Sequence, residues 1–212
     1  MPLPMVHLLV ANSIKCEKVN KTAEYFLGAI SPDAVHMRED YKREYKTASH
    51  FGIKNVGSLE NIKDFLKIIE NAKEDERKNF LKGYLVHLLT DKLWLDTLYE
   101  DVYLKNYESD AAPSLDIREA YYNDTDQIDL ALYRKMPQRN GIFEMVEKAE
   151  IFGIDKVLRS ENVYMWKVRT LNWFGSENRQ YMPLKYIKYE DVIEFSKFAS
   201  SKIEELLENL IS

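Results

Sequence analysis

The sequence Tyr84-Leu-Val-His-Leu-Leu-Thr-Asp-Lys-Leu-Trp94 lies within the longest helical pattern of the chain, residues 75–105. Its apolar side chains recur every three or four residues, which predicts a helix with a broad apolar face. His87 and Asp91 are four residues apart, so they share one face of that helix. Because an isolated buried carboxylate is costly, Asp91 needs a partner. Taken alone, the pair is more simply explained by a His–Asp hydrogen bond on the helix surface, and a metal ion shared by the two residues is the alternative.

Helical spacing continues on both sides of this stretch, with expected N-caps at Ser58 and Ser160. The other helices are expected at 4–14, 19–29, 59–73, 115–135, 142–152, 161–173 and 189–211. Residues 34–57 and 175–188 are expected to be irregular. Only 7 Gly and 6 Pro interrupt the chain, which disfavours a turn-rich β-fold. The sequence therefore predicts an all-α fold, with one domain over residues 1–212.

The composition limits the class of partner. Hydrophobic residues make up 45% of the 212 residues and charged residues 31%, as in globular proteins with a sizeable core. The net charge is -5, and the 30 basic residues are scattered among 35 acidic ones. We therefore expect no nucleic acid as a main partner, because no basic run is present to bind a phosphate backbone.

The location is predicted from three features. Cys16 is the only cysteine, so no intramolecular disulfide can form. The N-terminus lacks a basic region followed by a long apolar run, and we expect no signal peptide. No window approaches the roughly 20 apolar residues that span a bilayer, so stable membrane insertion is not expected. A cytoplasmic location is the simplest interpretation.

The histidines are distributed unevenly, because all four precede residue 88: His7, His36, His50 and His87. A carboxylate follows a small-residue turn in Gly28-Ala-Ile-Ser-Pro-Asp33. Taken singly, each residue has an ordinary explanation. Asp33 can cap a turn, His7 can be a core histidine with its polar atoms paired, and His50 can lie on the surface.

Taken in order, four motifs resemble a known family. They are His7-Leu-x-x-Ala11, Leu27-Gly-x-x-x-Pro-Asp33, Ser49-His-Phe51 and Gly83-x-x-x-His-Leu-x-x-Asp91. Together they resemble the bacterial zinc-dependent phospholipase C-like family, part of the wider phospholipase C/P1 nuclease fold. The resemblance covers roughly residues 1–100 and implies a multi-helix domain whose His and Asp side chains surround zinc.

The resemblance matches five residues to metal ligands: His7, Asp33, His50, His87 and Asp91. It implies that His7 binds a second metal and that Asp91 bridges the two. The chain departs from the family because it starts Met1-Pro2, where secreted members use a free N-terminal tryptophan, and because no histidine follows residue 87. One zinc ion is therefore expected and two are the upper limit. Mn²⁺ or Fe²⁺ would also accept these nitrogen and oxygen ligands.

Two residues are candidates for catalysis. Asp33 can act as general base on a metal-bound water, and Arg38 can bind an anionic group near the metal. His36 either orients Asp33, contacts substrate or is exposed. The acidic segment Tyr122–Asp129 either reaches the site or begins a helix, and we favour the helix start. Core packing accounts for most of the aromatic residues, although Trp94, Trp166 and Trp173 could also form a substrate cleft.

These observations favour a metal-dependent hydrolase that acts on a phosphoester of a small, anionic substrate. Two alternatives remain. One is a non-catalytic helical binding protein with a structural metal, which the missing downstream histidines favour. The other is an HD-type phosphohydrolase, which requires an adjacent His-Asp pair that this sequence lacks. The oligomeric state is not indicated by any feature of the sequence.

Overall fold

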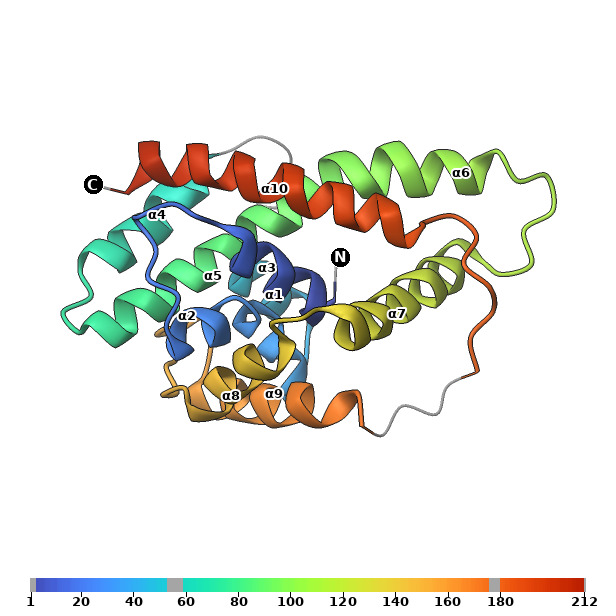
Figure 1. Cartoon of the computed structure of the whole chain (residues 1–212). Helices are drawn as coiled ribbons and strands as arrows, with labels where there is room; N and C mark the ends of the chain where they lie inside the picture. Colours follow the sequence, from blue (N-terminus) through green and yellow to red (C-terminus); the bar gives the residue numbers. More distant parts are fainter. Residues whose placement is uncertain (1–2, 53–58, 176–179, 212) are drawn as a thin grey trace.

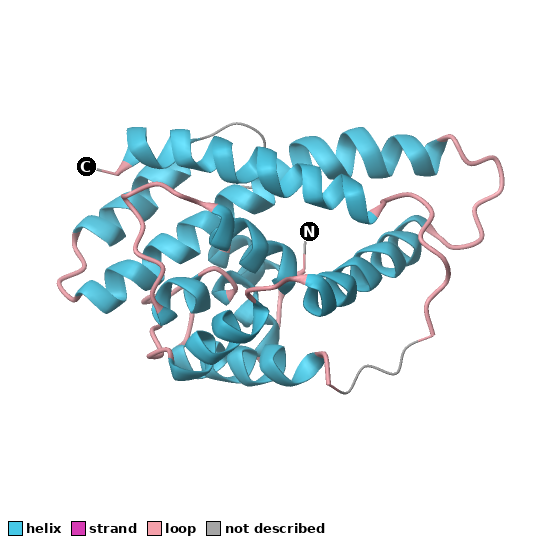
Figure 2. Ribbon diagram, in the orientation of Figure 1, coloured by secondary structure: helices cyan, strands magenta, loops and turns pink. Residues whose placement is uncertain are grey.

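The chain is all-helical in the computed structural model, which describes residues 3–52, 59–175 and 180–211 (Figures 1 and 2). No β-strand occurs within those ranges. Two elements depart from α-helical geometry: the 3₁₀ helix η1 (Ser31–Met37) and the π-helix η2 (Leu95–Leu104). The α-helices are α1 (Pro4–Ser13), α2 (Ala23–Gly28), α3 (Arg43–Ser49), α4 (Leu59–Glu70), α5 (Asp75–Trp94), α6 (Lys105–Glu108), α7 (Ile117–Lys135), α8 (Arg139–Lys148), α9 (Ser160–Trp173) and α10 (Tyr189–Leu210).

Helix α5 is the central element of the fold. It contacts α1, α2, α4 and α10, and most residues from Phe80 to Trp94 are buried. The broad apolar face predicted for this stretch is therefore wider than one stripe, as expected of a helix enclosed by others. Its backbone continues without a break into η2 and α6, which run along the upper edge of Figure 1 beside α10. The predicted helix over 75–105 is confirmed, and its last third is π-helical.

Helices α2 and α5 approach each other closely because glycines meet at their crossing. A Cβ atom at Gly28 would overlap the carbonyl oxygen of Phe80, and one at Gly83 would overlap that of Tyr25. Thr22 caps the start of α2, where its hydroxyl accepts a hydrogen bond from the backbone N–H of Tyr25 at 3.4 Å. The close crossing at Gly28 and Gly83 holds the end of α2, and the η1 segment that follows it, against the middle of α5.

The expectation of an irregular chain over 34–57 is wrong for residues 34–37 and 43–49, which are helical, and holds for residues 38–42 and 50–52. Pro32 lies in the first turn of η1, where its missing N–H costs no helical hydrogen bond, so the turn continues as a 3₁₀ helix. The charged stretch Arg43–Ser49 then forms α3, which packs against η1. Ser58 lies outside the described residues. Ser160 is the first residue of α9, with Arg159 as its N-cap.

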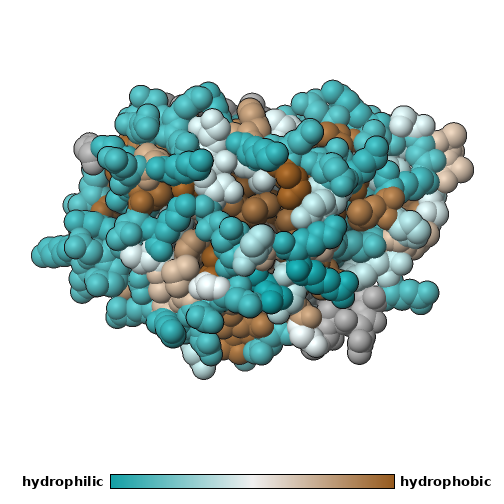
Figure 3. Space-filling view, viewed as in Figure 1, coloured by the Kyte–Doolittle hydropathy of each residue, from teal (hydrophilic) through white to brown (hydrophobic). Residues whose placement is uncertain are grey.

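The exterior matches the charged composition. The face of the molecule seen in Figure 3 is mainly hydrophilic, with apolar side chains in small separate areas. No helix of the described ranges is both long enough and apolar enough to cross a membrane. Inside, the buried apolar side chains form one connected core that runs from Met5 in α1 to Leu207 in α10.

Candidate metal centre

The structure brings together all five residues predicted as metal ligands, and it does so from four elements. His7 lies in the middle of α1, Asp33 in η1, and His50 directly after α3, while His87 and Asp91 lie one turn apart on α5. All five side chains belong to buried residues, with exposed fractions between 0% for His87 and 8% for Asp33. Buried histidines and aspartates at this density require a common partner.

Asp91 lies at the middle of the group. Its Oδ1 is 3.6 Å from Nε2 of His7, and its Oδ2 is 3.3 Å from Nε2 of His50 and 3.9 Å from Nε2 of His87. The same His50 nitrogen is 3.6 Å from Oδ1 of Asp33. The rings of His7 and His87 stack, with centroids 3.7 Å apart and an interplanar angle of 8°. Asp91 thus offers one oxygen to His7 and the other to His50.

Backbone contacts orient two of the imidazoles. Nδ1 of His87 lies 2.9 Å from the carbonyl oxygen of Ala29, at the end of α2, and Nδ1 of His50 lies 2.9 Å from that of Lys46. These acceptors favour a proton on Nδ1, which leaves the lone pair on Nε2 of each ring. With this tautomer, the Nε2 atoms of both rings face the group as acceptors, although Oγ of Ser49 also lies 2.9 Å from Nδ1 of His50.

The atoms at the middle of the group have no hydrogen-bonding partner among the described residues. They are both nitrogens of His7, Nε2 of His50 and His87, and both carboxylate oxygens of Asp91. Unpaired buried polar atoms are rare, and six in one place indicate a missing ligand. Two overlapping sets have ligand atoms within 4.8 Å of one another: His7, Asp33 and His87, and His50, His87 and Asp91.

The electrostatics leave His7, His87 and Asp91 in the protonation states that bind metal. Burial, followed by the neighbouring His87, lowers the pKa of His7 well below its usual value, and burial also lowers that of His87. Burial alone would raise the pKa of Asp91, but His50 and the other imidazoles outweigh it, so that this pKa is lowered. Neutral imidazoles and an ionised carboxylate match the nitrogen and oxygen ligands that Zn²⁺, Mn²⁺ and Fe²⁺ accept.

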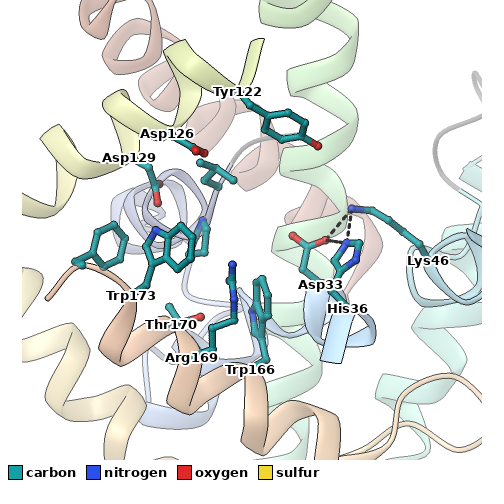
Figure 4. Close-up of a pocket in the computed structure, with 13 residues that line it drawn as sticks. Asp33, His36, Lys46, Tyr122, Asp126, Asp129, Trp166, Arg169, Thr170 and Trp173 are labelled. Atoms are coloured by element: carbon teal, nitrogen blue, oxygen red, sulfur yellow. Dashed lines mark hydrogen bonds and ion pairs between the residues drawn. The ribbon is translucent and has the colours of Figure 1, made fainter. Parts of the chain in front are cut away.

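Asp33 lies between this group and a cavity. Its Oδ1 accepts a hydrogen bond from Nζ of Lys46 at 3.0 Å, and the same ammonium group is 3.1 Å from Nε2 of His36 (Figure 4). Burial would raise the pKa of Asp33, but Lys46 and the imidazoles hold it well below the usual value. The pKa of Lys46 is raised, because Asp33 outweighs the effect of burial. Both side chains are therefore charged at neutral pH.

The cavity has a volume of about 380 Å³, within the range of small-molecule sites. Its wall combines residues of η1, α3, α7 and α9 with the start of α1. Prominent among them are Asp33, His36, Lys46, Tyr122, Asp126, Asp129, Trp166, Arg169, Thr170 and Trp173 (Figure 4). His36 is an exposed residue of this wall, as one of its three alternatives states, and its Nε2 lies 3.8 Å from Oδ1 of Asp33.

The structure does not bring Arg38 to this cavity. Its guanidinium forms hydrogen bonds of 3.0 and 2.9 Å with Asp40 and lies 3.6 Å from the centroid of the Tyr45 ring. It lines a separate depression beside residues 153–159. Lys46, from the same charged segment, takes the position predicted for Arg38. Because Lys46 lies four residues before His50, helical spacing at the end of this segment would have indicated it.

The acidic segment Tyr122–Asp129 lies in the middle of α7, so the predicted helix start is wrong. Asp124 accepts backbone hydrogen bonds from Tyr186 at 2.7 Å and Ile187 at 3.0 Å, which fixes the chain before α10. Asp126 and Asp129 face the cavity (Figure 4). Trp166 and Trp173 also line it, whereas Trp94 is a core residue. The spacing of Trp166, Arg169 and Trp173 would have indicated one helix face.

Asp129 has a measurable consequence for stability. Its Oδ1 accepts a hydrogen bond from the backbone N–H of Met5 at 2.8 Å, and burial raises its pKa well above 3.8. The folded protein therefore keeps this proton at pH values where the unfolded chain has lost it. The resulting stabilisation is complete below the unfolded-state pKa and disappears as the pH rises through the folded-state value.

We expect Asp129→Asn, which keeps the acceptor oxygen but cannot ionise, to lose less stability than the wild type between about pH 5 and pH 8. Urea unfolding of both proteins at the two pH values measures this difference. Other groups titrate equally in the two proteins, so the difference isolates Asp129. Parallel pH profiles would show that Asp129 is ionised throughout.

Comparison with protein-family models, with curated proteins and with solved structures yields no match to this chain. The resemblance to the zinc-dependent phospholipase C-like family therefore stays a prediction. The placement of its five matched residues in one buried group is an observation of the structure alone.

Proposed function

We propose that this protein is a metal-dependent hydrolase, of the phospholipase C/P1 nuclease type, that cleaves a phosphoester of a small anionic substrate. The observation that carries the proposal is the set of unpaired buried atoms of His7, His50, His87 and Asp91 next to a cavity. A structural hydrogen-bond network would pair these atoms with one another. Their separations of 3.3 to 3.9 Å are long for hydrogen bonds and suit atoms that surround a cation.

In this proposal the group holds one zinc ion through His50, His87 and Asp91, with space for a second at His7 and Asp33. When bound, such an ion lowers the pKa of a coordinated water and polarises a phosphoryl oxygen. Asp33 is at the boundary of the ligand group and the cavity, where its carboxylate can accept a proton from a water. Lys46 keeps Asp33 ionised and adds a positive charge for an anionic substrate.

The experiment compares chelator-stripped and zinc-reloaded protein, purified without a His tag, in the hydrolysis of bis(p-nitrophenyl) phosphate. We expect zinc-dependent turnover, and a decrease of about 10²- to 10⁴-fold for Asp33→Asn, in line with the loss of a general base. Zinc content is measured on the same samples. The matched control is Asp101→Asn, because Asp101 is an exposed carboxylate that pairs with Lys105 at 2.7 Å on the surface of η2. We expect this control to keep full turnover.

A second function is favoured by the burial of the group, since His7, His50 and His87 have exposed fractions of only 1%, 2% and 0%. Closed sites of this kind are typical of structural metals. In that case zinc would bind with no effect on phosphodiester turnover, and Asp33→Asn would change only zinc content or stability. Turnover that persists after chelation would contradict both proposals.

A further inference from the structure

One face of α9 forms a wall of the cavity and carries a cation between two aromatic rings. Trp166, Arg169, Thr170 and Trp173 follow one another at spacings of three, one and three residues, which places all four on the same side of the helix. The guanidinium carbon of Arg169 is 4.8 Å from the centroid of the Trp166 ring and 4.4 Å from that of Trp173. Figure 4 shows Arg169 extending from α9 into the cavity between the two indoles.

This arrangement fixes a side chain that is otherwise flexible. Cation–π contacts on both sides restrict the guanidinium, whose N–H groups lie in its plane and are directed away from the ring faces. A planar fork of donors held in this way matches the oxygens of a phosphate or carboxylate. Because the contacts already restrict the side chain, less entropy is lost when an anion binds.

Two further polar groups on the same wall lack a hydrogen-bonding partner among the described residues. They are Nε1 of Trp166 and Oγ1 of Thr170, which belong to residues only 6% and 2% exposed. The indole nitrogen can only donate a hydrogen bond, and the hydroxyl can donate one as well. Both atoms are enclosed by protein, so an acceptor in the cavity would stabilise this wall if a small movement of the wall let it reach them.

The opposite wall adds a second cation. Lys46 lies on that side with Asp33 and His36 (Figure 4). Two acids, Asp126 and Asp129, also line the cavity, but the raised pKa of Asp129 leaves this residue uncharged at acidic pH. At such pH values the two cations, Arg169 and Lys46, equal in number the two remaining acids of the wall, Asp33 and Asp126, before any metal is bound. A metal at Asp33 would make the cavity net positive.

We propose that Arg169 and Lys46 bind the anionic group of a small organophosphate in this cavity, and that a ring in its organic part packs against Trp173 and Phe174. The proposal rests on the proposed function, because Asp33 belongs to both the cavity and the ligand group. The anion would lie between the two cations, next to Asp33. Trp173 and Phe174, which come from the end of α9, supply an apolar surface for the organic part.

The probe is phenylphosphonate, a phosphate-like anion with a ring that cannot be hydrolysed as an ester. Its affinity is measured by titration calorimetry with metal-free and zinc-loaded protein. We expect Arg169→Gln to weaken binding about tenfold to hundredfold in both forms, the range for a lost charge-assisted hydrogen bond. Zinc content should be unchanged, because Arg169 is not one of the ligands. Arg139→Gln is the matched control. Arg139 lies on α8, outside the cavity wall, and its guanidinium carbon is 4.4 Å from the centroid of the Tyr133 ring on α7.

A second set of titrations tests the ring. We expect the wild type to bind phenylphosphonate more tightly than methylphosphonate or inorganic phosphate, and Trp173→Leu to remove this preference. Equal affinities for all three probes would contradict the organic subsite and leave a simple phosphate site. Each variant is first shown to have a thermal unfolding midpoint within a few degrees of that of the wild type. If Arg169→Gln does not fold, Arg169→Lys, which keeps the charge but loses the planar fork of donors, replaces it in the titrations.

The outcomes separate this proposal from the proposed function. Wild-type affinity of Arg169→Gln for phenylphosphonate, or no binding by the wild type in either form, would overturn the Arg169 subsite even if zinc binds. Binding that depends on Arg169 in a protein that takes up no metal would support the subsite and contradict the metal-dependent hydrolase.

Discussion

Zinc should raise the thermal unfolding midpoint of the metal-free protein by about 5 to 15 °C when its free concentration is about 10² to 10³ times the dissociation constant. A ligand that binds only the folded state contributes about 3 to 4 kcal/mol at such concentrations, and 1 kcal/mol shifts the midpoint of a chain of this size by about 2 to 4 °C. The physical reason is the group of unpaired atoms on His7, His50, His87 and Asp91, which have no partner until a cation is present. Differential scanning calorimetry at several zinc concentrations measures the shift.

Asp91→Asn is the variant that tests this expectation most directly. Asparagine has nearly the same shape as aspartate, so the fold should be kept, but it lacks the charge that faces both His7 and His50. We expect zinc affinity to fall at least about a hundredfold, since even residues behind the ligands change metal affinity by tenfold to a hundredfold. The midpoint should then hardly respond to zinc at concentrations that stabilise the wild type.

Cys16→Ser is the control for the zinc experiment. The only thiol of the chain could bind zinc elsewhere, yet Cys16 belongs to neither of the two candidate ligand sets. Serine can still accept the hydrogen bond that the sulfur accepts from the backbone N–H of Lys18. The zinc-dependent shift should persist in this variant. A shift that vanishes in Cys16→Ser and persists in Asp91→Asn would place the metal at the thiol.

The candidate ligands were predictable from the sequence to different degrees. His87 and Asp91 required only helical spacing and an apolar setting, and both are buried on one face of α5 as predicted. Helical spacing within one helix, which relates His87 to Asp91, says nothing about His7, Asp33 and His50, because these residues come from other elements. Their place in the group was predicted from the order of motifs that resemble those of the zinc-dependent phospholipase C-like family. The structure agrees, because η1 and α3 bring Asp33 and His50 to α5.

The substrate side of the site was not predictable in the same way. Lys46 and Arg38 lie in the same charged segment, and only the formation of α3 distinguishes the cation that reaches Asp33 from the one that pairs with Asp40. The acids of α7 and the aromatic face of α9 reach the cavity through contacts between distant helices. Local patterns can assign a residue to a helix face, but they do not specify which other helix that face meets.

The crossing of α2 and α5 positions both Asp33 and His87, and we expect it to be the most sensitive point of the fold. A Cβ atom at Gly28 would overlap Phe80 O and lie 2.9 Å from Phe80 C, and one at Gly83 would overlap Tyr25 O and lie 2.8 Å from Tyr25 C. Both obstacles are helix backbone, which cannot rotate away as a side chain can. Gly28→Ala and Gly83→Ala should each therefore lower the free energy of unfolding by about 3 kcal/mol, at the upper end for overpacked cores.

Urea unfolding of these variants gives the free energies, and Gly141→Ala serves as the control. Gly141 lies in α8. Apart from its chain neighbours and the backbone of its own helix, no described atom lies within 4 Å of the point where an alanine methyl group would be, so its replacement should be neutral or stabilise the protein by up to about 1 kcal/mol. The double variant at positions 28 and 83 should lose less free energy of unfolding than the sum of the two single losses, because the first methyl group already separates the helices.

Separation of the helices would also weaken zinc binding. It would move the carbonyl oxygen of Ala29 away from Nδ1 of His87, a distance of 2.9 Å in the intact structure. Wild-type stability of both glycine variants would show that the helices cross at a larger distance, and the orientation of His87 would then need another cause.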